Sequence, residues 1–289
     1  MTAAHGFPDG SEDRTQTPAP ATGKVWLVGA GPGDAGLLTV KGLRALEAAD
    51  VIVADRLGAR AVLDGLAADG VTLRAEVVDV GKRPGHHAVP QDAINALLVQ
   101  LALDGKTVVR LKGGDPYIFG RGGEELAACQ EADVAVEVVP GITSAVSVPA
   151  IAGIPLTHRG VATAFTVATG HDQIRALGGG SDHTVVLLMG VGTLAHSAIT
   201  LARGERGADC PVAVVEDGYG PRQRVTVGTL ATIAHQAAER GIRSPAVVVV
   251  GDVVRLSPYA PADLATLKPE TYDPLAEPLA EPLPGKTAL

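Results

Sequence analysis

Short apolar runs rich in Val, Ile and Leu alternate along the chain with longer segments rich in Ala and Leu. The short runs have the length and β-branched content of buried strands, and the longer segments have helical spacing. In the first half, strands are predicted at 24–30, 51–55, 107–111 and 134–140, and helices at 37–49, 90–105 and 124–132. Nearly continuous apolar strands that alternate with helices indicate a parallel sheet covered on both faces.

The segment 140–160 interrupts this alternation with prolines, glycines and small residues. A second series of apolar runs and helical patterns follows at 164–170, 183–190, 193–204, 210–217, 226–241 and 245–256. The sequence therefore predicts an α/β protein of two domains, 24–150 and 151–257, each a mainly parallel or mixed sheet flanked by helices. Ligands of such folds bind beyond the carboxyl ends of strands, often between domains.

The two ends of the chain have a different composition. Residues 1–23 are polar and rich in Pro and Thr, and residues 258–289 repeat a Pro-Leu-Ala-Glu unit. Neither segment carries enough apolar surface to form a core, so both are predicted to be disordered tails. The first segment has no apolar stretch typical of a signal peptide, and no run approaches the roughly 20 apolar residues of a membrane span.

Charge and cysteine content narrow the classes of partner. The formal net charge of −8 disfavours binding to nucleic acid or to an anionic membrane. Cys129 and Cys210 lie far apart, which predicts reduced, buried thiols and a cytoplasmic location. No histidine or cysteine spacing is typical of a metal site, so no metal is predicted.

The first glycine-rich loop, GAGPGDAG at 29–36, lies between a predicted strand and a helix. Its glycines at 31, 33 and 36 match the spacing of a dinucleotide-binding fingerprint. Asp55 ends the second predicted strand, where such proteins carry a ribose-binding acid. A nicotinamide-dependent Rossmann oxidoreductase is therefore an alternative interpretation.

Two residues of this loop disfavour the dinucleotide interpretation. The carboxylate of Asp34 would repel a pyrophosphate, and Pro32 lacks the N–H group that a phosphate cradle needs. The remaining explanation for the glycines is a tight turn between strand and helix.

The second loop, KGGDPYIFGRGG at 112–123, follows the strand at 107–111. Gly113 and Gly114 allow a backbone to approach a ligand closely, and Asp115 with Pro116 favours a turn. The loop also holds Tyr117 and Phe119, two of only eight aromatic residues in the chain. We predict that this loop binds a ligand and that its rings form an apolar wall; the alternative is that the rings anchor the loop in the core.

These loops, together with VPGITSAVSVPAIAGIPLTHRG (139–160), LLMGVGTL and SPAVVVVGDVV, resemble the tetrapyrrole (corrin/porphyrin) methylase family over nearly all of 24–256. The resemblance implies S-adenosylmethionine (SAM) as cofactor, a homodimer, and an active site in a cleft between two α/β domains. It also implies methylation of uroporphyrinogen III at C2 and C7, through precorrin-1 to precorrin-2. Another precorrin methyltransferase of the corrin pathway is the alternative within this family.

The resemblance also assigns residues to the site. The cofactor positions that it implies are Pro32, Gly113, Gly114, Asp115, Thr143, Ser144, Met189, Ala213 and Ala246. The positions that it ties to catalysis are Asp55, Leu57 and Phe119. The sequence departs from the family pattern at Ala54, where relatives often carry Tyr, and at Gly218-Tyr219, where a Gly-Thr pair is more usual.

A tetrapyrrole with eight carboxylates can bind to a net negative protein only at a local basic patch. Arginine suits this role because its guanidinium binds a carboxylate at two points. The predicted substrate contacts in the loops are Arg56, Lys82, Arg83, Arg121 and Arg159, with Arg222 and Arg224 as further candidates. Of these, Arg121 is also a candidate for catalysis, because it follows the aromatic residues at the start of a predicted helix.

Overall fold

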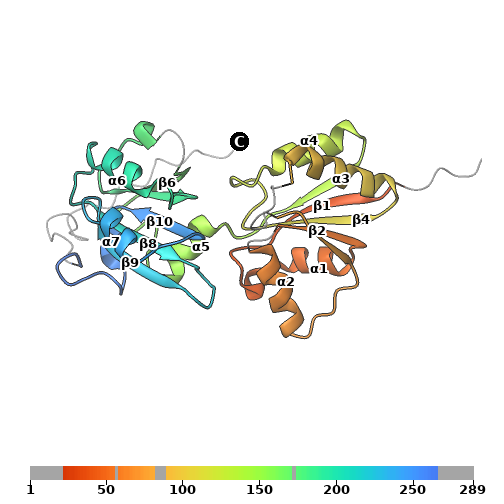
Figure 1. The fold of residues 1–289 in the computed structure, drawn as a ribbon, viewed down its shortest axis with the longest axis horizontal. Coiled ribbons are helices and arrows are strands. Elements are labelled where there is room, and N and C mark those ends of the chain that lie inside the picture. The colour runs from red at the N-terminus through yellow and green to blue at the C-terminus, as the bar shows by residue number, and fades with distance from the viewer. Residues whose placement is uncertain (1–21, 56–57, 82–88, 171–173, 266–289) are drawn as a thin grey trace, which may run out of the picture.

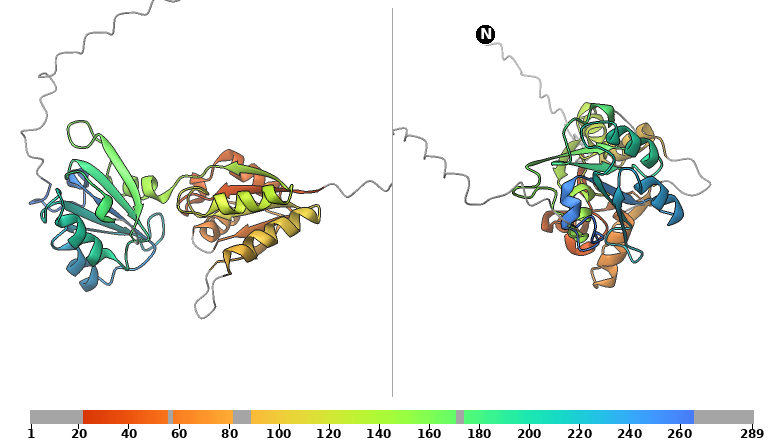
Figure 2. Two further views of the ribbon diagram at one scale, coloured as in Figure 1. Left: turned by 90° about the horizontal axis from the view of Figure 1, so that it is seen from above. Right: turned by 90° about the vertical axis from the view of Figure 1, so that its left-hand side faces the viewer.

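The structure is a computed structural model that describes residues 22–55, 58–81, 89–170 and 174–265. Figures 1 and 2 show two lobes side by side, joined by the segment that leads into α5 (Ser144–Ile151). Each lobe is built on one five-stranded sheet with helices against its faces. The predicted fold class, two α/β units with flanking helices, is therefore confirmed.

The first sheet has the strand order β3-β2-β4-β1-β5, and its paired strands are all parallel. Its strands are β1 (Lys24–Gly29), β2 (Val51–Ala54), β3 (Glu76–Asp79), β4 (Thr107–Lys112) and β5 (Ala135–Val139). Its helices are η1 (Ala35–Leu37), α1 (Val40–Glu47), α2 (Ala59–Ala68), α3 (Gln91–Leu103) and α4 (Gly122–Glu131). One face of the sheet packs against α1 and α2, and the other against α3 and α4 (Figure 1).

The second sheet is mixed, with the order β6-β7-β10-β8-β9. Strands β6 and β7 are parallel, and the other neighbours pair antiparallel. Its strands are β6 (Ala164–Thr169), β7 (His183–Leu188), β8 (Pro211–Glu216), β9 (Arg224–Thr229) and β10 (Ala246–Val250). The remaining helices are η2 (Ile174–Ala176), α6 (Leu194–Ala202), α7 (Ile233–Glu239) and η3 (Asp252–Leu256). Side chains of α6 and α7 pack on one face, and those of α5 and η3 on the other.

The structure contains elements that the apolar pattern does not reveal. Strand β3 has mostly exposed side chains and lies at the edge of its sheet, so it lacks the apolar run of a buried strand. Helix α5 contains Pro149, which makes its segment look like a loop in the sequence. Two segments predicted as single units each contain two elements. The segment 226–241 comprises the end of β9 and all of α7, and the segment 245–256 comprises β10 and η3.

The predicted domain boundary after residue 150 falls inside α5. The buried side chains of Ala145 and Val148 on this helix pack in the core of the second sheet. We therefore propose that α5 belongs to the second lobe and that the connection between the lobes lies at 140–143.

Local features explain why the elements pack closely. The Oγ1 atom of Thr39 accepts a hydrogen bond from the Gly42 N–H at 3.0 Å and caps the start of α1. A Cβ on Gly42 would lie 3.2 Å from the side chain of Val28, so the glycine lets α1 approach β1.

Cys129 and Cys210 are buried free thiols, and burial raises their pKa values to about 11 and about 12. Within the described ranges, no helix combines the length and apolar character needed to cross a membrane.

Candidate functional site

Three loops of the first lobe meet through their backbones where β1, β4 and β5 end. Gly31 and Gly114 exchange two hydrogen bonds, with N···O distances of 3.1 and 2.8 Å. A Cβ on Gly29 would lie 2.5 Å from the backbone of Gly141, closer than side chains tolerate. Gly114 has a φ of +68°, which favours glycine. Glycine at these positions is therefore required for the loops to touch.

Asp115 fastens two of these loops together with its carboxylate. Its Oδ1 atom accepts a hydrogen bond from the Tyr117 N–H at 2.8 Å, and its Oδ2 atom accepts one from the Gly141 N–H at 3.0 Å. The first bond shapes the loop after β4, and the second ties it to the loop after β5. In the structure Asp115 therefore holds the backbone that surrounds it.

The predicted cofactor positions of the first lobe lie around this junction. Pro32 is half-buried in the loop after β1, and Gly113 exposes its backbone after β4. Thr143 caps α5 by accepting a hydrogen bond from the Ala145 N–H, and Ser144 begins that helix. A Cβ on Gly114 would lie 3.7 Å from the Cα of Thr143, which places the loop after β4 beside the start of α5. The fold thus brings these residues of distant segments together.

In the second lobe, Met189 follows β7 and Ala246 begins β10. These strands pair antiparallel with Val248 opposite Leu187, so both predicted contacts lie at the same end of the sheet. Met189 is 52% exposed, whereas Ala213 is fully buried in the core of this sheet. Ala213 has no exposed surface in this structure, and its contact with a cofactor stays a prediction.

The loop between β8 and β9 is bonded to α5 through Tyr219. The hydroxyl of Tyr219 donates a hydrogen bond to the carbonyl of Ser147 on α5 at 3.0 Å. Burial raises the pKa of this hydroxyl, and the negative charge of Asp34 in the first lobe raises it further. The Tyr at position 219, a departure from the family pattern, therefore lies within electrostatic range of the loop after β1.

Backbone strain is concentrated in the same loops. Among the described residues outside glycine, six have a positive φ. Five of these lie in loops that follow β4, β7 and β8, namely Phe119, Arg121, Met189, Asp217 and Tyr219. Such conformations cost energy and are found preferentially at functional sites, which supports the choice of these loops.

A buried charge cluster lies under the end of β4. Successive side chains of a strand point to opposite faces, so Arg110 and Lys112 share the face that packs on α3 and α4. Both side chains are almost fully buried, and both donate hydrogen bonds to Oε1 of Glu125 on α4, at 2.9 Å from the guanidinium Nε and 3.0 Å from the ammonium. Glu125 has no exposed side-chain surface. Its charge thus compensates two buried cations.

The same arginine holds Asp55 at the end of β2. An Nη2 atom of Arg110 lies 2.5 Å from Oδ1 of Asp55, whose side chain is 35% exposed. Burial opposes the charge of Arg110, but the attraction and hydrogen bonds of Asp55 and Glu125 outweigh it and raise the pKa of the guanidinium. Burial lowers the pKa of Lys112, and repulsion by Arg110 adds to this effect. Asp55 is therefore a fixed carboxylate at the edge of the site.

Sequence reasoning selected Asp55 but missed the residues that hold it. The sequence does contain a sign of the two cations, because Arg110 and Lys112 interrupt an apolar strand two residues apart and therefore lie on one face. Glu125 was less visible, since the neighbouring Glu124 looks the same in the sequence. Only the packing of α4 distinguishes the buried carboxylate from the exposed one.

The aromatic residues of the loop after β4 lie on the surface. Tyr117 is 50% and Phe119 47% exposed, and Ile118 between them is 42% exposed. The alternative that these rings anchor the loop in the core is therefore wrong.

The guanidinium of Arg121 forms a two-point ion pair with the exposed carboxylate of Glu124, at 2.8 and 2.6 Å, so a substrate carboxylate would have to displace that partner.

Four of the remaining predicted substrate and catalytic residues lie outside the described part of the chain. These are Arg56, Leu57, Lys82 and Arg83. Arg159 is exposed in the turn between α5 and β6, and its carbonyl accepts a hydrogen bond from His158 at 2.8 Å. Its contact with a substrate stays a prediction.

Comparison with known proteins identifies the family. The family model described as Tetrapyrrole (Corrin/Porphyrin) Methylases matches residues 24–234. The chain belongs to the tetrapyrrole methylase family.

The chain is similar to named members of this family and to members of known structure. A Methanosarcina barkeri protein named S-adenosyl-L-methionine-dependent uroporphyrinogen III methyltransferase is 50% identical over 242 residues, which is 81% of this chain and 93% of that protein. A siroheme synthase of Gluconobacter oxydans is 51% identical over 241 residues, 81% of this chain but 50% of the relative. The structure of the Thermus thermophilus uroporphyrin-III C-methyltransferase complexed with S-adenyl homocysteine matches with a TM-score of 0.68 and 39% identity, covering 81% of this chain and all of that one.

For a tetrapyrrole methylase, the glycine fingerprint after β1 needs an explanation other than dinucleotide binding. The loop leads into the 3-10 helix η1, and α1 begins only at Val40. The Asp34 carboxylate accepts a hydrogen bond from the Gly36 N–H at 2.8 Å, so it occupies a donor that a phosphate would need. This geometry and the family both argue against the Rossmann oxidoreductase.

We predict that Glu125→Gln lowers the free energy of unfolding by about 3–5 kcal/mol, because it removes the charge that compensates two buried cations. The matched control is Glu124→Gln, one residue away on α4, which should change stability little because its ion pair with Arg121 is exposed. Urea unfolding of the three proteins makes the comparison. Equal effects of the two substitutions would show that the buried cluster does not stabilise the fold.

Proposed function

We propose that the protein is a SAM-dependent uroporphyrinogen-III C-methyltransferase. The observation that carries the proposal is the 50% identity to a protein of that name over 93% of its length. The loop junction of the first lobe supports it, because the predicted cofactor positions at the ends of β1, β4 and β5 lie together. The proposed reaction methylates uroporphyrinogen III at C2 and C7 and yields precorrin-2.

The residues at the junction fit the chemistry of SAM. This cofactor carries a carboxylate, an ammonium, a ribose and an adenine, but no phosphate, so it needs polar backbone groups rather than a cationic clamp. The exposed backbone of Gly113 and the start of α5 at Thr143 and Ser144 offer such groups. Met189 and Ala246 would contact the cofactor from the second lobe, with the exposed Met side chain as an apolar surface.

Bound SAM would supply an activated methyl group on its sulfonium. The protein's part is to align the nucleophilic ring carbon with that methyl group, an effect worth about 7–11 kcal/mol in well-oriented reactions. We propose that the exposed rings of Tyr117 and Phe119 hold the flat macrocycle. The Asp55 carboxylate, held by Arg110, is proposed to accept the proton that leaves the macrocycle or to bind its ring N–H groups.

The pathway that the product enters is a finer proposal. Two of the similar relatives are named siroheme synthase, and the match covers about half of their length. We therefore propose that precorrin-2 from this protein is used for sirohaem or cobalamin synthesis. A later precorrin methyltransferase activity is the second candidate, supported by the fold shared with a cobalt precorrin-4 methyltransferase at 24% identity.

Assembly and location are proposed on separate grounds. The family resemblance supports a homodimer, and light scattering that gives a monomer at micromolar concentration would contradict it. The buried free thiols Cys129 and Cys210 fit a reducing compartment, so we propose a cytoplasmic location. Cell fractionation would test it.

We predict that the purified protein transfers two methyl groups from SAM to enzymatically made uroporphyrinogen III, as read from product mass. SAM and S-adenosylhomocysteine should bind in calorimetry, whereas NAD and NADP should not, because Asp34 and Pro32 disfavour a pyrophosphate. Methylation of a later precorrin but not of uroporphyrinogen III would favour the second candidate. Binding of NAD without binding of SAM would exclude both.

We predict that Asp115→Ala weakens SAM binding at least about tenfold, because it removes a charged acceptor of two backbone hydrogen bonds. Gly114→Ala should also weaken binding, since its φ of +68° costs a non-glycine residue about 1–2 kcal/mol. Gly123→Ala in the same loop region is the control, because a Cβ there meets no atom within 4 Å and the residue lies in α4. Calorimetry with S-adenosylhomocysteine measures all three. Unchanged affinity in the first two variants would place the cofactor elsewhere.

A further inference from the structure

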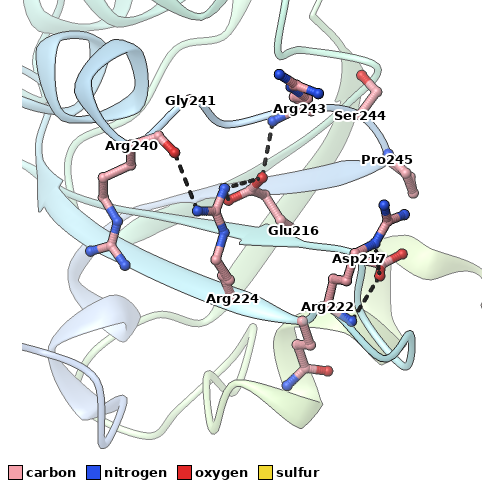
Figure 3. A pocket seen from close by; sticks show the side chains of 10 residues that line it. Glu216, Asp217, Arg222, Arg224, Arg240, Gly241, Arg243, Ser244 and Pro245 are labelled. Carbon is pink, nitrogen blue, oxygen red and sulfur yellow. Dashed lines mark hydrogen bonds and ion pairs between the residues drawn. The ribbon is translucent and has the colours of Figure 1, made fainter.

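A second candidate site lies in the second lobe, beside the predicted cofactor position at Ala246. A cavity of about 610 Å³ opens where β8 ends, β9 begins and α7 ends, and where the chain enters β10 (Figure 3). We call it the arginine pocket, because Arg222, Arg224, Arg240 and Arg243 line it together with the carboxylates of Glu216 and Asp217. Pro245 also lines it, so the pocket and the predicted cofactor contact share adjacent residues.

Glu216 makes the wall of the pocket rigid. Its side chain is 8% exposed and accepts hydrogen bonds from the Arg224 guanidinium at 2.8 Å and from the Arg243 N–H at 3.0 Å. Arg224 also donates to the carbonyl of Arg240 at the end of α7, at 3.2 Å. Figure 3 shows these bonds linking β8, β9 and the segment before β10. These bonds hold the walls of the pocket to one another.

The charges of the pocket do not balance. The guanidinium of Arg224 is paired with Glu216, and the Nε atom of Arg222 lies 3.5 Å from Oδ2 of Asp217. The other two arginines of the pocket are Arg240 and Arg243. Both residues are exposed, and within the described part of the chain their guanidinium groups make no hydrogen bond or ion pair. Two uncompensated cations beside one cavity, in a chain of net charge −8, favour an anion with two charges.

Arginine recognises carboxylates at two points, and each pyrrole ring of uroporphyrinogen III carries a pair of carboxylate arms on adjacent carbons. We propose that the arginine pocket binds the carboxylate pair of one pyrrole ring while the macrocycle lies against the cofactor. This inference rests on the proposed function and names a substrate contact of the same site. It also gives a role to Arg222 and Arg224, which hold the pocket walls rather than the ligand.

The test uses the variant Arg240→Ala/Arg243→Ala in the full chain. Its control is Arg74→Ala/Arg203→Ala, which removes the same charge at two other exposed arginines. The pocket variant should raise the KM for uroporphyrinogen III about tenfold, with SAM affinity unchanged, because it removes charge-assisted contacts made only by the tetrapyrrole. The control should leave KM unchanged. A pocket variant that behaves like the control would overturn the proposal.

Binding of oxidised porphyrins separates the pocket from the reaction. Uroporphyrin keeps two carboxylates on each ring, whereas coproporphyrin has one, so wild-type protein should bind uroporphyrin more tightly in fluorescence titrations. The pocket variant should lose this preference, and Arg240→Lys/Arg243→Lys should restore part of it, because lysine keeps the charge but not the two-point geometry. A preference that persists in the pocket variant would contradict the inference.

The two proposals can fail separately. If wild-type protein does not methylate uroporphyrinogen III but the pocket variant still abolishes the preference for uroporphyrin, the subsite stands and the proposed function falls. If methylation occurs but the pocket variant keeps the wild-type KM and the wild-type preference for uroporphyrin, the proposed function stands and the subsite falls. Unchanged melting temperatures of the variants confirm that each comparison concerns folded protein.

Discussion

Contact between three loop backbones is the constraint on which the site depends. Gly29, Gly114 and Gly141 approach so closely that a single Cβ would separate them. Parallel strands put their carboxyl ends at one edge, but side chains normally keep the following loops apart. The absence of side chains at this point lets the loops after β1, β4 and β5 form one surface. Polar backbone groups, rather than charged side chains, therefore dominate the proposed cofactor site.

The buried charge cluster under the end of β4 holds one carboxylate, that of Asp55, in a fixed position at this surface. Glu125 compensates Arg110 and Lys112 inside the first lobe, and Arg110 extends to the partly exposed Asp55. Together the four groups carry no net charge, so the cluster stabilises the position of Asp55 without attracting a polyanion. A carboxylate whose orientation is set by a buried guanidinium loses little freedom when it meets a substrate, which is the advantage of preorganisation.

The sequence allowed the fold class and the main strands to be predicted, because buried strands appear as apolar runs whatever their neighbours. It did not reveal β3, whose exposed edge position removes that pattern, or α5, whose Pro149 suggests a loop. For the site, glycine loops could be recognised locally. The partnership of Glu125 with Arg110 could not, because it depends on which face of α4 meets β4. The burial of Ala213 could not be predicted either, because a small residue suits a sheet core as well as a ligand site.

The placement of positive charge follows from these constraints. The first lobe cannot present Arg110 or Lys112 to a substrate, because Glu125 and the fold bury both. Arg121 is exposed but paired with Glu124. In the second lobe, the buried carboxylate of Glu216 fixes Arg224 and the Arg243 backbone. Among the described residues, the guanidinium groups of Arg240 and Arg243 beside the cavity have no hydrogen-bond or ion-pair partner. A net negative protein can thus bind a polycarboxylate if one lobe fixes the cofactor with neutral backbone groups and the other concentrates unpaired arginines next to it. The short segment at Pro245 and Ala246 joins these two functions, because one residue lines the arginine pocket and the next lies at the proposed cofactor position.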